Sequence, residues 1–219
     1  RKKKVVFKVG EALEDSKLIH LEDGERKHLH ADGTFCEHGE HDPHVWLGPP
    51  HAQDMVAAIA KKLGELRPEH AHAFADNAAA YNKKLQELHA YGLEKFKAKQ
   101  NRRVIVTHDF LRYFAQAYPI EIAGSIQPRP GLEADAGQLA KLVKLCKEKD
   151  VRVIVVEPQY SKGAAESLQQ HLKGQGIDVR LAEFDPLETA AAGADGNPDP
   201  GLYVRRMQEN IDNLVKALP

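Results

Sequence analysis

The sequence predicts an α/β fold in which one long helix links a C-terminal α/β lobe, built on a parallel sheet, to a first lobe that is incomplete in this chain. Three observations predict it. From Arg102 onward, apolar strand-like runs alternate with helical segments, which is typical of parallel βαβ units covered by helices on both faces. Ahead of them, residues 68–99 form one long amphipathic helix suited to linking two lobes. The chain also begins almost inside a short strand-like run, so we expect more of the first lobe to lie upstream.

The composition is that of an ordinary globular chain, with 219 residues and 42% hydrophobic content. Lys and Arg number 31 against 32 Asp and Glu, and this balance gives no electrostatic footprint for nucleic acid or an anionic membrane. No apolar run approaches the ~18 residues of a membrane span, and no secretory leader opens the sequence. The two cysteines are expected to be unpaired.

The first half of the chain is predicted as strand, loop and two helices. Residues 5–9 contain three valines and a phenylalanine, which favours a strand. Residues 17–50 contain four glycines and three prolines, so we expect little regular structure there. Residues 51–66 keep helical spacing, and Pro68 suits the first position of the long helix. That helix would be ~45 Å long, and its apolar stripe consists of Phe74, Ala78, Tyr81, Leu85, Leu88, Gly92 and Phe96.

The second half is predicted as alternating strands and helices. The strands are expected at 104–107, 151–156 and 179–184, and the helices at 136–149, 162–173 and 199–218. Three segments follow from these elements. Residues 1–66 are the remainder of the first lobe, 67–100 the linking helix, and 101–219 the second lobe.

Histidine is the one unusual feature of the composition. Six of the twelve histidines fall within 24 positions, in a stretch with few apolar residues: His28, His30, His38, His41, His44 and His51. Such a local bias is typical of metal binding. His44 also lies beside Trp46, the only tryptophan, and next to Pro43, which restricts its backbone. A coordinating imidazole and a tryptophan-anchored surface loop both remain open interpretations.

Two further candidate ligands follow predicted strands. His108 comes directly after the strand at 104–107, and Asp185 directly after the strand at 179–184. Ligands of open parallel sheets bind beyond the carboxyl ends of the strands, so both side chains are placed to share one divalent cation. The alternatives are a hydrogen-bonded core histidine and an aspartate that starts a turn before Pro186. Position alone leaves these alternatives open.

Five motifs in register resemble the metal-binding, cluster A-I type substrate-binding proteins of ABC transporters. The motifs are at residues 42–47 (DPHVWL), 106–109 (VTHD), 124–133 (GSI and PGLE), 156–161 (VEPQYS) and 184–187 (FDPL). The resemblance extends from about Val5 to the C-terminus. It implies two parallel-sheet α/β lobes joined by one long helix, with a single metal in the cleft between them. The implied ligands are His44, His108 and Asp185, with a further histidine from upstream of this chain.

The resemblance also implies cargo, partners and location. The manganese binders of the family place Glu where this chain has His108, and imidazole suits zinc, so Zn2+ is favoured over Mn2+. The expected partner is the membrane permease of a metal ABC transporter, with no nucleic acid. The implied location is periplasmic or otherwise extracytoplasmic, for a monomer that is peripheral to the membrane or lipid-anchored. One departure is Gly48, where the family usually has Asp after the tryptophan motif.

The histidine-rich loop resembles the loop of zinc-specific members of the family. It is a candidate secondary metal site formed by His28, His30, His38 and His41, and Cys36 could join as a thiolate. A flexible polar loop without metal is the alternative. Cys146 lies on the apolar face of its predicted helix and is expected in the core.

Two competing functions remain. Three ligands and an open position also describe a catalytic zinc, which would make the chain a zinc-dependent hydrolase. The sequence contains no H-E-x-x-H helix, no G-x-S-x-G elbow and no Ser/His/Asp set that would supply a general base, so the hydrolase is a distant second. A metal-dependent adhesin would need the same site. We therefore expect a binding protein that performs no catalysis.

Overall fold

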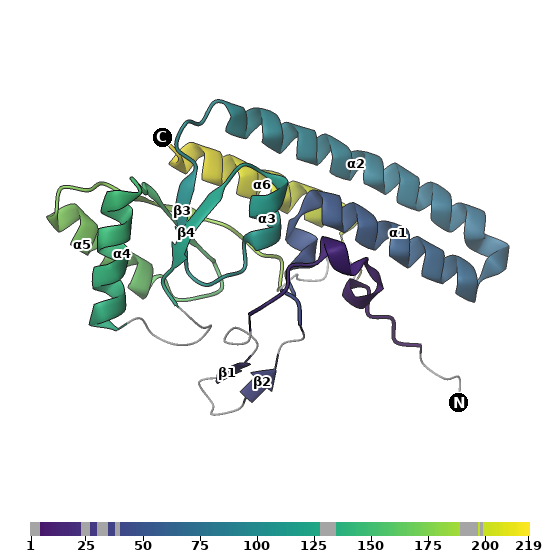
Figure 1. Cartoon of the computed structure of the whole chain (residues 1–219). Coiled ribbons are helices and arrows are strands. Elements are labelled where there is room, and N and C mark those ends of the chain that lie inside the picture. The colour runs from purple at the N-terminus through teal and green to yellow at the C-terminus, as the bar shows by residue number, and fades with distance from the viewer. Residues whose placement is uncertain are drawn as a thin grey trace.

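The computed structural model describes residues 5–22, 27–29, 35–37, 40–127, 135–188, 197 and 199–219, with the backbone alone for 27–29 and 35–37. Its α/β architecture confirms the predicted fold class (Figure 1). Four strands form a parallel sheet in the order β4-β3-β5-β6. The strands are β3 (Arg103–Val106), β4 (Glu121–Ser125), β5 (Val153–Val156) and β6 (Arg180–Glu183).

Helices cover both faces of this sheet because its central strands are apolar on both sides. Val104, Val106, Val153 and Val155 belong to the core shared with α2 (Ala71–Lys97), α3 (Arg112–Ala117) and α6 (Leu202–Ala217). The alternate residues, among them Ile105 and Ile154, pack with α4 (Ala136–Glu148) and α5 (Gly163–Gly174). The period-2 alternation of strand side chains thus separates two cores.

The long helix and its partner form a layer beside the sheet. Helix α1 (Pro49–Leu66) lies against α2, and α6 packs along another part of α2 (Figure 1). A 3-10 turn, Pro68–His70, separates α1 from α2. The predicted stripe of α2 is confirmed, since its buried residues are Leu85, Leu88, Gly92 and Phe96. The role of this helix as a link between lobes stays a prediction.

Two expectations for the first fifty residues were wrong. Residues 5–9 are not a strand, and the side chains of Val5 and Val6 are 60% and 84% exposed. In the described part of the chain no strand pairs with this run, and an extended segment without a pairing partner gains no ladder hydrogen bonds. The loop also contains more regular structure than predicted. Strands β1 (Lys27–Leu29) and β2 (Phe35–Glu37) form an antiparallel hairpin that projects from the body (Figure 1).

Two elements of the second half were not predicted. Strand β4 lies at the edge of the sheet, where its residues are at most half-buried, so it lacks the apolar run that marks β3 and β5. Helix α3 has only six residues, too few for a helical period to stand out.

Cys146 confirms its predicted place in the core. It is buried and unpaired, and burial raises the pKa of its thiol to about 11. The side chain of Cys36 lies outside the described residues. In the part of the chain that the structure describes, no helix combines the length and apolarity needed to cross a bilayer.

Candidate metal centre

The carboxyl end of the parallel sheet gathers the predicted ligands. His108 follows β3, Glu157 follows β5, and residues 184–188 follow β6. His44 comes from the other half of the chain and precedes the 3-10 turn Val45–Leu47 and α1. The structure brings His44 and His108 together, with 5.8 Å between the centroids of their rings. Two imidazoles bound to one tetrahedral zinc at about 2 Å would have centroids about 5 Å apart, so a small adjustment suffices.

A buried carboxylate fixes the ring of His108. Nδ1 of His108 lies 2.8 Å from Oε2 of Glu157, which also accepts a 2.6 Å hydrogen bond from the Thr107 hydroxyl. Glu157 is only 1% exposed, and Gln159 Nε2 donates to its other oxygen. Because a carboxylate accepts, the proton of the neutral ring sits on Nδ1 and Nε2 keeps its lone pair. A metal-ligating histidine is commonly held in this way.

A buried carboxylate, that of Asp42, also fixes the ring of His44. Oδ1 of Asp42 accepts from the backbone N–H of His44 and lies 2.8 Å from its Nδ1, while Nε2 lies 3.5 Å from Oε1 of Glu188. Burial by itself lowers the pKa of His44, but the hydrogen bonds and charges of Asp42 and Glu188 outweigh it and raise the pKa to about 9. The hydrogen bond from His44 in turn lowers the pKa of Glu188. A divalent cation can replace the proton that these two groups share.

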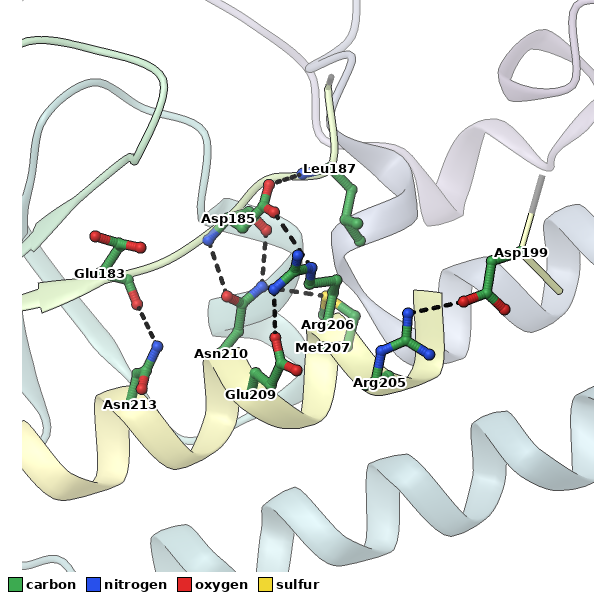
Figure 2. A network of polar contacts seen from close by, with 10 residues as sticks. All are labelled: Glu183, Asp185, Leu187, Asp199, Arg205, Arg206, Met207, Glu209, Asn210 and Asn213. Atoms are coloured by element: carbon green, nitrogen blue, oxygen red, sulfur yellow. Dashed lines mark hydrogen bonds and ion pairs between the residues drawn. The ribbon is translucent and has the colours of Figure 1, made fainter. Parts of the chain in front are cut away.

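A strained turn precedes Glu188, and Figure 2 shows two of its residues, Asp185 and Leu187. Leu187 has a φ of 62°, which is rare for a residue with a branched side chain. The Asp185 carboxylate stabilises the turn by accepting a 2.8 Å hydrogen bond from the backbone N–H of Leu187. Asn210 of α6 makes two 2.8 Å hydrogen bonds to the backbone of Asp185. From the opposite side, Trp46 Nε1 donates to the carbonyl of Pro186 at 2.8 Å.

Asp185, the carboxylate predicted from the sequence, is engaged within its own turn and with α6. One oxygen accepts from Leu187, and the other lies 3.9 Å from Nε of Arg206 (Figure 2). Its assignment as a ligand stays a prediction. Glu188 is the carboxylate that faces His44, and sequence reasoning missed it. It lies one residue beyond the DPL motif, but only the left-handed conformation of Leu187 directs it back toward the histidines.

Aromatic side chains line the histidine pair. The Phe110 ring lies 5.2 Å from the His108 ring and 6.4 Å from the His44 ring, and Trp46 and Tyr160 each approach one of the two. Such surroundings reduce the competition of water for a bound cation and strengthen its attraction to Glu188. Two imidazole nitrogens and a carboxylate oxygen are a ligand set suited to zinc.

Gly48, the departure from the family pattern, has a packing reason. A Cβ at this position would lie 2.6 Å from Nδ1 of His51 and 2.9 Å from the carbonyl oxygen of Tyr113. Helix α1 therefore begins without a side-chain cap and with prolines in its first turn instead. The close contact of α1 with α3 leaves no room for an aspartate.

The predicted secondary metal loop is only partly described. His30 and His38 lie outside the described residues, and His28 is described by its backbone alone. His41 is described, and among the described residues its neighbours include Asp15 and His20.

Comparison with known proteins gives consistent matches. The family model ZnuA, described as zinc-uptake complex component A periplasmic, matches residues 1–217. The high-affinity zinc uptake system protein ZnuA of Brucella abortus (strain 2308) is 30% identical over 181 residues, 83% of this chain and 51% of that protein. The manganese-binding lipoprotein MntA of Bacillus subtilis (strain 168) is 29% identical over 96% of this chain and 64% of its own length. The chain thus spans about half to two thirds of these relatives.

A solved structure shows the same fold. The periplasmic zinc-binding protein TroA from Treponema pallidum superposes with a TM-score of 0.77 at 26% identity, over 99% of this chain and 73% of that one.

Proposed function

The chain belongs to the ZnuA family of periplasmic zinc-uptake components, and from that premise we propose that it binds Zn2+ outside the cytoplasm and delivers it to the permease of an ABC transporter. The observation that carries the proposal is the paired arrangement of His44 and His108. Each ring is fixed through Nδ1 by a buried carboxylate, so each keeps Nε2 for a shared cation.

The proposed ligands are His44 Nε2, His108 Nε2 and the Glu188 carboxylate. Asp185 is the competing carboxylate, and the further histidine expected from upstream would complete the set. Because MntA of Bacillus subtilis is named as a manganese-binding relative, family membership alone does not choose the metal. Two imidazoles favour zinc over manganese, which prefers oxygen ligands.

The proposed activity is binding and release without catalysis. In the metal-free chain a proton occupies the pair His44 and Glu188, and zinc entry displaces it. The reverse exchange, in which a proton returns to His44 and Glu188, assists the release of zinc at the permease. We propose a monomer in the periplasm, peripheral to the membrane or lipid-anchored; some relatives carry the name lipoprotein.

A calorimetric zinc titration of the metal-free chain tests the ligand assignment. One tight equivalent is expected, weakened at least about 100-fold by His44→Ala or His108→Ala, since each removes a metal bond. The exposed His72→Ala on α2 is the matched control and should bind as the parent does.

The same titration separates the two carboxylates. Glu188→Gln should weaken binding strongly, whereas Asp185→Asn keeps the oxygen that accepts from Leu187 and should retain most of the affinity. The reverse order would assign Asp185 as the ligand. Tight binding that survives the loss of both His44 and His108 would reject the centre altogether, and Mn2+ that competes equally with Zn2+ would reject the choice of metal.

A further inference from the structure

A second group of metal-binding side chains lies outside the proposed centre, where the histidine-rich loop leaves the body of the protein. It consists of Asp15, from the 3-10 turn Asp15–Lys17, and of His20 and His41. His41 Nε2 lies 2.8 Å from one oxygen of Asp15, and His20 Nε2 lies 3.2 Å from the other. The two rings are 4.4 Å apart between centroids.

The backbone holds the two histidines side by side. They form an isolated antiparallel bridge that closes the base of the loop. On either side of this bridge, Leu21 N donates to the Glu40 carbonyl and Asp42 N donates to the Ile19 carbonyl, both at 2.8 Å. These bonds fix the backbone of both histidines, so their side chains start from neighbouring positions before any metal binds.

A buried tyrosine ties this bridge to the core. The hydroxyl of Tyr113, a fully buried residue of α3, accepts from the backbone N–H of Ile19 and donates to the carbonyl of Asp42. Each of these partners is the chain neighbour of one of the two histidines. The pair therefore belongs to the folded body rather than to the projecting hairpin, and preorganisation of this kind lowers the entropic cost of binding a ligand.

The three side chains offer the chemistry of a zinc site. One nitrogen from each histidine and one oxygen of Asp15 all lie within 4.8 Å of one another, so modest rotations bring them to bonding distance around one ion. Asp15 and His20 are largely exposed, which leaves positions for water and makes exchange with solvent easy. A plain surface ion pair would need only one imidazole, and it would stabilise the chain little.

We propose that Asp15, His20 and His41 form a second, solvent-accessible zinc site at the base of the histidine-rich loop. This site is independent of the proposed centre of His44, His108 and Glu188. It differs from a site within the loop because it does not require His28, His30 or His38. Its exposed ligands make it the weaker and faster-exchanging of the two.

Zinc calorimetry on a His44→Ala/His108→Ala chain isolates the second site. One residual equivalent is expected, and His20→Asn, His41→Asn or Asp15→Asn added to that background should each remove it. His72→Asn is the matched exposed control and should leave it intact. A triple change of His28, His30 and His38 to Asn should also leave it intact.

Three results would overturn the proposal: no residual equivalent, a residual equivalent indifferent to His20→Asn and His41→Asn, or one removed by the triple change alone. If the His44→Ala/His108→Ala chain does not fold, the second site can be tested in the chain that keeps both histidines. Its zinc stoichiometry should fall from two to one in His20→Asn, with the affinity of the tight equivalent unchanged. A stoichiometry that stays the same would reject the site.

Discussion

At the scale of single residues, the proposed centre depends on two buried carboxylates that are not themselves assigned as ligands. Asp42 and Glu157 are each 1% exposed, and each approaches Nδ1 of one histidine at 2.8 Å. A buried charge needs a partner of this kind, because isolation in the interior would cost several kcal/mol. The carboxylates therefore stabilise the fold and orient the imidazoles together.

Glu157→Gln is expected to weaken zinc binding about 10- to 100-fold while the chain remains folded. The neutral amide keeps the shape of the side chain but removes the negative charge that makes the His108 ring a better ligand. Calorimetry measures the affinity, and circular dichroism checks the fold. The exposed Glu166→Gln in the first turn of α5 is the control. Equal affinities for the parent and Glu157→Gln would show that Glu157 does not tune the ligand.

At the scale of elements, α2 and α6 determine where the loops at the end of the sheet lie. The stripe of α2 packs into the same core as α3 and α6. At Gly92, α2 approaches Tyr118, a nearly fully buried residue at the end of α3. Helix α6 fixes the Glu188 turn through Asn210. The packing of these helices therefore helps to position the loop that contains Glu188.

Gly92→Ala should destabilise the chain by about 1–3 kcal/mol, because overpacking forces neighbouring groups to shift. The new Cβ would lie 2.4 Å from Cε1 of Tyr118, whose ring is confined by Phe96 and Phe114. Urea denaturation measures the change in the free energy of unfolding. Gly174→Ala at the end of α5 meets nothing within 4 Å and should be neutral or slightly stabilising. Equal stability of the two variants would contradict this packing account.

At the scale of the whole molecule, the proposed centre joins segments that are more than a hundred residues apart. The Trp46 segment contacts the Glu188 turn through the carbonyl of Pro186, and the Tyr203 hydroxyl of α6 donates to the carbonyl of Trp46 at 2.6 Å. These two bonds connect the region before α1 with the C-terminal helix. The position of Glu188 relative to His44 therefore depends on the whole fold.

Trp46→Phe is expected to weaken zinc binding about fivefold, as expected for the loss of one hydrogen bond worth about 1 kcal/mol. The aromatic packing beside His44 is largely kept, but the Glu188 turn loses its donor. Tyr91→Phe removes a hydrogen bond to Asp212 between α2 and α6, away from the proposed ligands, and should leave zinc affinity unchanged. Equal losses in both variants would mean that the effect is one of general stability.

The sequence by itself determined the elements whose patterns are local. The strands that became β3, β5 and β6 were predicted to within about two residues at their ends. The signal was clearest for the central strands β3 and β5, whose faces are both buried and whose apolar runs are continuous. The stripe of α2 was predictable from its helical period, because one face of the helix is buried and the rest is exposed. The order of the motifs indicated His44 and His108 as candidate ligands, and the predicted strand at 104–107 placed His108 at a strand end.

Only the tertiary structure decided which side chains meet. Residues 5–9 have the composition of a strand, yet they have no pairing partner in the described part of the chain, because strand formation depends on a neighbour that composition does not reveal. Glu188 faces His44 because Leu187, the residue before it, has a left-handed backbone conformation. His41 meets Asp15 and His20 through a bridge between segments some 20 residues apart. Periodicity reports the environment of one segment, whereas a metal site depends on distances between segments, and packing alone sets those distances.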